Sequence, residues 1–492
     1  MDIYKEQQSN DESQTDKYKM HTDDEDNKIN LVNIDFWQNK FKLITQKVNE
    51  PEINISSVEQ ALSDFRKSIN QKNYPPIEFV IDSINFFFSF LQEPWQCSLK
   101  VICVAIIDCF VTYLKVPFID LVAPNLINTL LSIFFDNSIQ EDPYFLIFTY
   151  NITKVFKTSS VFSQEFAYTL YQSKFLSDFV IYFIVNYDLE TIGALNLPDS
   201  ASISLYTTFI NIIQIFIAWI KLTDIIQDDA VEYLIKLFIE MFKLNNEKID
   251  NVICKELMYI YDKRKKIPLI LLETGFFQVV WNAIASQIPI DKGMDFLSNG
   301  LIKENSIQQE ICNIIDIQIV FNISKKYFGL SKIAHQQKKE ELEIILEASI
   351  VLIANFLSFK KQLPESVPIN GILAFIQDVF KYSNYSVKNC ASFLMLELLS
   401  TNDYMRIDSI YPNEFLVLFF DTISSGNDEV IEKGIDVFES FLSKALKCNF
   451  DIYQSEFYAN FIKDFLENAL NMVQFAVKAE FLLRKYYYND DV

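Results

Sequence analysis

Glycine is so scarce in this chain that its scarcity restricts the fold more than any other feature does. Only eight glycines occur among 492 residues. The hairpins and bulges of β-proteins prefer glycine at positions of positive φ, and a β-protein of this size would need many of them. From Ile53 onward, apolar residues recur at helical spacing almost without interruption, and no stretch alternates steadily between apolar and polar residues. The sequence therefore predicts an all-α fold with short polar connections.

A motif with a small residue in the middle of a helix recurs towards the C-terminus. Its pattern is an apolar residue, a small residue four positions later, a second apolar residue three positions after that, and an apolar or amide residue four positions later again. The small residues of successive copies lie 43, 43 and 45 positions apart. A small residue lets a neighbouring helix approach closely, and a repeat of this length is typical of HEAT and armadillo arrays. The small residues are Ala348, Ala391, Gly434 and Ala479.

Three segments that contain the motif resemble the last helix of an armadillo repeat. They are ELEIILEASIVLIANFL (341–357), NYSVKNCASFLMLELL (384–399) and VQFAVKAEFLL (473–483). This resemblance to the armadillo/HEAT superfamily implies a right-handed superhelical solenoid over 53–487. The first 30 residues hold nine acidic and four basic residues, so 1–52 is expected to be an acidic, largely disordered tail. Residues 488–492 are expected to form a short acidic C-terminal tail.

The residues that carry common catalytic chemistry are rare. The chain has two histidines, His21 in the acidic tail and His335 in a polar segment. Two histidines so placed argue against a histidine-containing catalytic triad and against a metal site built from several histidines. No glycine-rich phosphate loop occurs, and the seven cysteines are scattered without a CxxC pair, as buried reduced thiols would be. Glu340, Glu341 and Glu343 indicate a solvated helix face. We therefore expect no enzyme activity, no cofactor and no metal.

The charge of the chain narrows the class of partner. The formal net charge is −22, which opposes binding to nucleic acid as a principal partner. A protein or peptide partner is expected instead, and the acidity favours a basic one. The N-terminus lacks the apolar region of a secretory signal, so we expect the cytoplasm, with the nucleus as an alternative. The oligomeric state does not follow from these features.

One segment is long and apolar enough to be tested as a membrane span. No residue between Asp199 and Lys221 is charged. Its polar residues recur at three- and four-residue spacing, which predicts a nearly buried helix in a helical array. We therefore expect no membrane span, and no second segment matches this one in length.

The resemblance to the armadillo family implies that a partner binds on the concave face of the array. Asn211, Gln214 and Asn355 are the amides that could read a peptide backbone there, although buried amides more often bond within the fold. The first expectation is a non-catalytic protein-binding scaffold or adaptor. An importin-alpha-like nuclear transport adaptor for basic peptides is the alternative, although no tryptophan here has asparagine four positions later. A regulatory subunit of an enzyme complex is the third.

Overall fold

The computed structural model describes residues 34–488 apart from 71–72, 187–198, 223–225, 244–245, 262–265, 287–289, 304, 362–363, 365–366, 402–412, 425 and 449. These residues form helices and connections, with one isolated bridge between Asn70 and Asn73 and no β-strand. The prediction of an all-α chain is thereby confirmed for the described residues. The chain divides into two compact units, Met1–Gln227 and Asp228–Val492, and each is described by itself. One continuous array over 53–487 stays a prediction.

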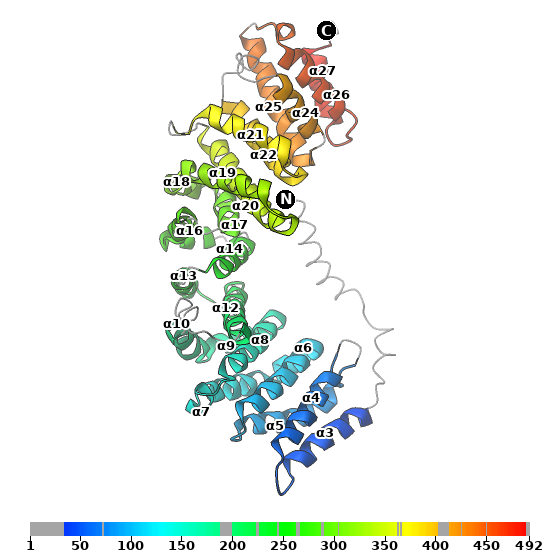
Figure 1. Ribbon diagram of the computed structural model, residues 1–492, viewed down its shortest axis with the longest axis vertical. Coiled ribbons are helices and arrows are strands. Elements are labelled where there is room, and N and C mark those ends of the chain that lie inside the picture. The colour runs from blue at the N-terminus through cyan, green and yellow to red at the C-terminus, as the bar shows by residue number, and fades with distance from the viewer. Residues whose placement is uncertain are drawn as a thin grey trace. The chain divides into compact units, whose positions relative to one another are not determined.

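The helices of the first unit are α3 (Ile34–Val48), α4 (Ile55–Ser68), α5 (Ile77–Gln92), α6 (Cys97–Phe134), α7 (Asn137–Gln140), α8 (Phe145–Phe162), α9 (Gln164–Gln172), the π-helical turn η1 (Phe175–Val180), α10 (Ile181–Asn186) and α12 (Asp199–Ile220). Helix α6 packs on α4, α5 and α8, and α8 packs on α12 (Figure 1). Lys115, with a φ of 53°, breaks α6 into two helical segments. The apolar faces between these helices form the core of this unit.

Helix α3 lies inside the segment 1–52 that the composition predicts to be largely disordered. It packs on α4, and its Trp37 and Ile44 are fully buried. The Trp37 ring also meets Phe65 of α4 edge to face, with the ring centroids 5.6 Å apart. The prediction was wrong for 34–48 because the average composition of the tail hides apolar residues at helical spacing. Residues 1–33 and 489–492 lie outside the described part of the chain, so the predictions made for them stay predictions.

The helices of the second unit are α13 (Asp228–Phe242), α14 (Glu247–Tyr261), α15 (Ile267–Glu273), α16 (Phe276–Ala285), α17 (Asp291–Lys303), α18 (Asn305–Ile314), α19 (Ile317–Ile333), α20 (Gln336–Lys360), α21 (Ile369–Tyr382), α22 (Tyr385–Thr401), α24 (Asn413–Ser424), α25 (Asp428–Lys447), the 3₁₀ turn η3 (Ile452–Gln454), the π-helical turn η4 (Phe457–Ile462), α26 (Lys463–Ala469) and α27 (Ala476–Tyr486). They stack in two rows. One row runs α14, α17, α20, α22, α25 and α27, each packed on the next. The other contains α13, α16 and α18, drawn beside α14, α17 and α20 in Figure 1.

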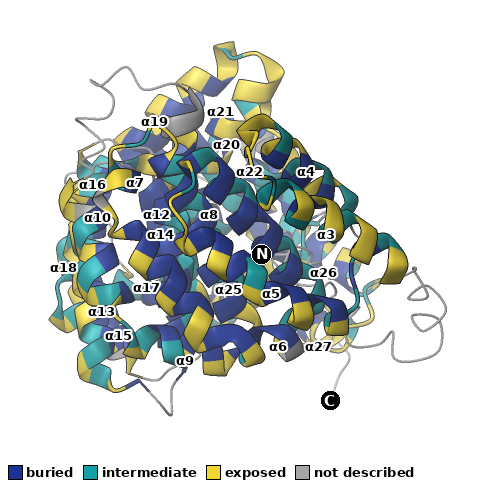
Figure 2. Ribbon diagram, turned by 90° about the horizontal axis from the view of Figure 1, so that it is seen from below, coloured by how far each residue is buried: buried dark blue, intermediate teal, exposed yellow. Residues whose placement is uncertain are grey.

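The four copies of the small-residue motif fall on consecutive members of the first row. Ala348, Ala391, Gly434 and Ala479 lie on α20, α22, α25 and α27, and all four are buried. At Gly434 the approach is close, because an added Cβ would lie 2.9 Å from the Phe465 ring of α26 and the ring would have to shift. Buried and exposed residues occupy different faces of the helices (Figure 2). The even spacing of the motif therefore corresponds to helices that stack in chain order.

Three of the described helices contain segments long and apolar enough to cross a membrane, judged by length and composition alone. The segments are Cys97–Val116, Ile203–Ile220 and Gln336–Lys360, and the bent pair Ile267–Glu273 and Phe276–Ala285 would make a fourth. The expectation that only the segment after Asp199 has this character was therefore wrong. Between 61% and 67% of the tested window in each single helix is buried within the fold. The absence of a membrane span stays a prediction.

Candidate functional site

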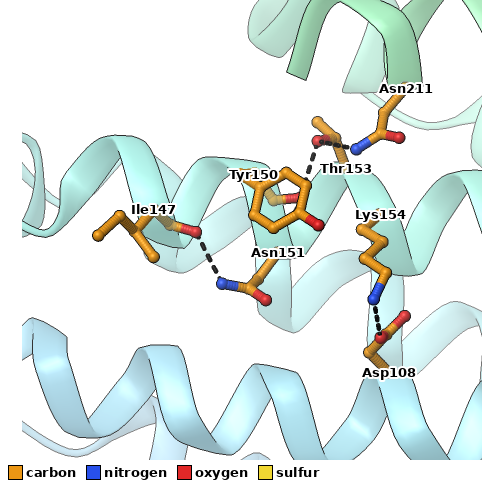
Figure 3. A network of polar contacts seen from close by, with 7 residues as sticks. All are labelled: Asp108, Ile147, Tyr150, Asn151, Thr153, Lys154 and Asn211. Atoms are coloured by element: carbon orange, nitrogen blue, oxygen red, sulfur yellow. Dashed lines mark hydrogen bonds and ion pairs between the residues drawn. The ribbon is translucent and has the colours of Figure 1, made fainter. Parts of the chain in front are cut away.

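Asn211 was predicted to contact a partner, but its side chain ties two helices together. It lies on α12 and is 3% exposed. Its Nδ2 donates a hydrogen bond to Thr153 Oγ1 on α8 at 3.2 Å, and Thr153 Oγ1 donates to the Tyr150 carbonyl at 3.0 Å (Figure 3). A buried amide normally finds such an internal partner. In this structure, Asn211 therefore has a place in the packing of α8 and α12.

Asn355 also ties two helices together, in the second unit. It lies on α20, is 6% exposed and donates from Nδ2 to Ser298 Oγ on α17. Gln214, the third predicted contact residue, is half-buried on α12, and no described residue forms a hydrogen bond with it. The structure thus does not bring the three amides together, and a partner contact by Gln214 stays a prediction.

An ion pair between a buried carboxylate and a partly exposed lysine lies close to the Asn211 network in the first unit. Lys154 Nζ of α8 is 2.7 Å from Asp108 Oδ2 of α6, and Asp108 is 6% exposed (Figure 3). Burial lowers the pKa of Lys154, but the hydrogen bond and charge of Asp108 outweigh it and leave that pKa raised. This pair joins α6 to α8 just as the amide joins α8 to α12.

Carboxylates are concentrated on three helices of the second unit that pack one on the next. Carboxylates of α14, α17 and α20 lie near enough to influence one another electrostatically. We call this set the acidic face. Lys292 is 3.2 Å from Asp291 and 3.0 Å from Asp295, and Lys339 is 3.9 Å from Glu343. The acidic face consists of Glu247 and Asp250 on α14, Asp291 and Asp295 on α17, and Glu341, Glu343 and Glu347 on α20.

Like charges and partial desolvation act together on this face. The pKa of Glu247 is raised by partial burial first, and then by the nearby carboxylates Asp291 and Glu341. The pKa of Glu347 is raised by burial first, and then by Glu343 and Asp295. Both effects make the ionised form less favourable, and a cation placed beside these carboxylates would reverse that.

Asp250 is the most deeply buried carboxyl of the acidic face. It is 0% exposed, and neither of its oxygens has a hydrogen-bond partner. Burial raises its pKa to about 8. Its neighbour Cys254, one turn further along α14, has a pKa raised by burial and by Asp250, Asp291 and Asp295 together. Asp250 therefore lies on the side of α14 that faces α17.

Glu343 corrects the interpretation of residues 340–343 as a solvated helix face. It is 3% exposed, and its Oε2 accepts a hydrogen bond from Asn384 Nδ2 at 2.7 Å. Its Oε1 is buried without a hydrogen bond. The signal available in the sequence was the spacing of carboxylates by three or four residues in three neighbouring helices, as in Glu343 and Glu347. That spacing places them on one side of each helix.

The described residues give little basis for metal or nucleophile chemistry. Among them, no group of three or more His, Cys, Asp or Glu side chains could hold a metal ion. His335 is exposed at the N-cap of α20, and His21 lies outside the described residues. The seven cysteines are free thiols, and burial raises the pKa of Cys97 to about 12. A thiol with a raised pKa is a poor nucleophile.

Comparisons with known proteins give only distant likenesses. No family model and no curated protein matches the chain. An engineered protein of known crystal structure is 10% identical, with a TM-score of 0.48 over 91% of this chain and 98% of its own. SYS-1 alone is 12% identical with a TM-score of 0.34, and SYS-1 in its complex with POP-1 is 13% identical with a TM-score of 0.33. Each covers 92% of this chain and 95% of the SYS-1 chain. All three scores lie below 0.5, and they do not show to which family the chain belongs.

Proposed function

We propose that this protein is a non-catalytic scaffold or adaptor that binds a protein or peptide partner, and that the partner contacts the acidic face. The observation that supports it is the gathering of carboxylates on α14, α17 and α20, of which Glu247 and Glu341 are exposed and Asp291 and Asp295 are half-buried. Such a set loses hydration and gains mutual repulsion in the free protein. A lysine- or arginine-rich segment would supply the missing positive charge.

We further propose that the helices form an armadillo/HEAT-like right-handed solenoid. The row from α14 to α27, in which each helix packs on the next, supports this fold. The even motif on α20, α22, α25 and α27 supports it independently. The free cysteines agree with a reducing compartment, and we propose the cytoplasm, with the nucleus as an alternative.

A fluorescein-labelled peptide of alternating arginine and serine tests the basic-partner proposal. We expect micromolar binding at low salt, and the affinity should fall as salt screens the charges. The triple variant Glu247→Gln/Asp291→Asn/Glu341→Gln should bind about tenfold more weakly. Its matched control, Asp428→Asn/Glu429→Gln/Glu432→Gln on α25, removes the same charge elsewhere. Equal weakening by both variants would mean that net charge alone attracts the peptide, and the acidic face would lose its role.

A nuclear transport adaptor for basic peptides is the second candidate, and it shares the charge of the acidic face. It predicts that clustered lysine and arginine bind more tightly than the same residues dispersed along a peptide. Equal affinity for the two arrangements would remove this candidate but keep the scaffold. The third candidate, a regulatory subunit, would use the same face to hold an enzyme carried by another chain.

A further inference from the structure

Helix α27 carries apolar side chains on two sides. One side packs on α25 and α26, and its buried residues include Ala479, Leu482 and Leu483. The other side exposes a row of apolar side chains, which we call the outer stripe. Its members are Val473, which is 92% exposed, Val477, which is 81% exposed, and Phe481, which is 56% exposed. A helix that is apolar on both sides is normally covered on both sides, so the outer stripe has the character of an interface.

The members of the outer stripe follow one another at helical spacing. They are four positions apart in the chain, and residues four apart share one side of a helix. Val473 precedes the first residue of α27, but the Ala476 N–H donates to the Met472 carbonyl and so continues the helical hydrogen-bond pattern back past it. Among the described side chains, no other helix has more than one large apolar side chain that is over half exposed.

The charges beside the outer stripe cancel. Each cation of α27 has a partner within the fold: Lys478 pairs with Asp436 and Glu439 of α25, Arg484 pairs with Glu480, and Lys485 lies over the ring of Phe481. Three cations therefore lie beside three carboxylates, in a chain whose net charge is −22. A second copy of the chain would meet less repulsion here than on the acidic face. A strongly charged partner would find no complementary charge.

We propose that the outer stripe binds the outer stripe of a second copy of this chain, with the two α27 helices antiparallel. Because no other described helix has a matching stripe, the contact joins identical surfaces, and such a contact closes a two-fold dimer. Val477 lies at the two-fold axis and faces its own counterpart. Phe481 of each copy then lies opposite Val473 of the other, so that a large side chain meets a small one at both ends.

The size of the outer stripe sets the expected strength of the dimer. A standard interface buries about 800 Å² on each partner, whereas the largest apolar patch of an ordinary monomer covers about 300–600 Å². The outer stripe can therefore form the apolar centre of an interface. The exposed residues Gln474, Glu480 and Arg484 beside it would form the polar rim. We expect a reversible dimer with a dissociation constant in the micromolar range.

Sedimentation equilibrium of the full-length protein tests the proposal. The average mass should rise from that of one chain towards that of two between about 1 and about 100 μM. Added salt should strengthen the dimer, because it screens the repulsion between two chains of charge −22. A chain that stays monomeric at about 100 μM would overturn the proposal. A dimer that weakens with salt would also overturn it, because charged groups would then make the contact.

A variant at the two-fold axis and a matched control locate the contact. Val477→Glu should abolish the dimer, because it brings two carboxylates face to face among apolar side chains. Val477 is exposed in one copy, so the variant should unfold at the same temperature as the natural protein. The control is Ile333→Glu on α19, where a single apolar side chain is 82% exposed. It should leave the dimer unchanged, and equal loss in both variants would contradict the assignment to α27.

A pair of opposite charges tests the two-fold arrangement. Val477→Lys should be monomeric by itself, as Val477→Glu is. An equal mixture of the two variants should dimerise again, because a lysine then faces a glutamate across the axis. A mixture that stays monomeric would contradict the antiparallel pairing.

Two more measurements separate the outer stripe from other modes of binding. Vesicles of phosphatidylcholine should not bind the natural protein. Binding that Val477→Glu abolishes would assign the stripe to a lipid surface and overturn the proposal. Val477→Glu should bind the arginine–serine peptide as the natural protein does, because the acidic face lies on α14, α17 and α20. The dimer and the acidic face can therefore each fail without the other.

Discussion

The two units bury carboxylates in different ways. Among the described residues, the first unit has one buried carboxylate, Asp108, and the second has three, Asp250, Glu343 and Glu397. Asp108 is 2.7 Å from Lys154, and Glu397 is 2.6 Å from Lys433 on the next helix of its row. Asp250 has no such cation. The paired carboxylates connect helices, whereas burial of Asp250 without a cation favours its neutral form and raises its pKa to about 8.

This difference separates polar groups that bond between helices from carboxylates that lack a cation. In the first unit, Asn211 bonds to Thr153 between α12 and α8, and Lys154 pairs with Asp108 between α8 and α6 (Figure 3). On α14, α17 and α20, carboxylates outnumber the lysines beside them, and burial raises several of their pKa values. The acidic face therefore lowers the stability of the free protein at neutral pH, and a basic partner would recover part of that loss.

The largest expected effect concerns Asp250. Its pKa is about 8 in the folded protein and 3.8 for a fully solvated aspartate, so the folded state holds the proton more tightly than the unfolded state does. The contribution of Asp250 to stability is therefore greatest at low pH and is lost as pH rises from about 4 to about 8. Asp250→Asn removes this loss. Urea unfolding at pH 5, 6, 7 and 8 should show the variant gaining on the natural protein by up to about 1.4 kcal/mol per pH unit.

A control variant shows whether the pH dependence comes from the buried carboxyl of Asp250. The matched control is Asp82→Asn on the exposed side of α5, where the carboxyl is solvated before and after unfolding. Its difference from the natural protein should stay nearly constant with pH. A constant difference for Asp250→Asn as well would show that water or a neighbouring group compensates the buried carboxyl, and the contrast between the units would weaken.

The next largest expected effect is the loss of stability when the lysine is removed from either lysine–carboxylate pair. Lys433→Met leaves Glu397, which is 0% exposed, with the more distant Lys361 at 3.8 Å and the Ser400 hydroxyl at 3.5 Å as its remaining partners among the described residues. We expect a loss of about 3 kcal/mol in the free energy of unfolding. Lys154→Met should cost less, about 2 kcal/mol, because the Lys154 side chain is 41% exposed and solvent screens its pair.

A second substitution in each pair shows whether the lost charge contact is the cause. Adding Glu397→Gln to Lys433→Met, or Asp108→Asn to Lys154→Met, should restore part of the stability measured by urea unfolding, because no buried charge is then left alone. Double variants no more stable than the single ones would assign the loss to packing of the lysine stems.

The sequence predicted the fold class better than the site, for physical reasons. Scarce glycine and helical spacing are local properties, and they led to an all-α chain and to the row motif of Ala391 and Gly434. Burial of Glu343 depends on which helices meet, and its neighbours Glu340 and Glu341 are exposed on the same helix. Local composition failed in the same way at Trp37, which is fully buried in a segment expected to be disordered.

The smallest expected effect tests the amides that sequence reasoning assigned to a partner. Asn211 donates to the hydroxyl of Thr153 on α8, and Asn355 donates to the hydroxyl of Ser298 on α17. Asn211→Ala and Asn355→Ala should each lower the free energy of unfolding by about 1 kcal/mol, because a buried hydrogen bond is lost. Neither should change the affinity for the arginine–serine peptide.

Thr153→Val, which keeps the side-chain volume, should lower stability like Asn211→Ala because it removes the same hydrogen bond. Loss of peptide affinity in either asparagine variant, with stability unchanged, would return that amide to the binding surface. For Asn211 that result would also contradict the proposal that the partner contacts the second unit.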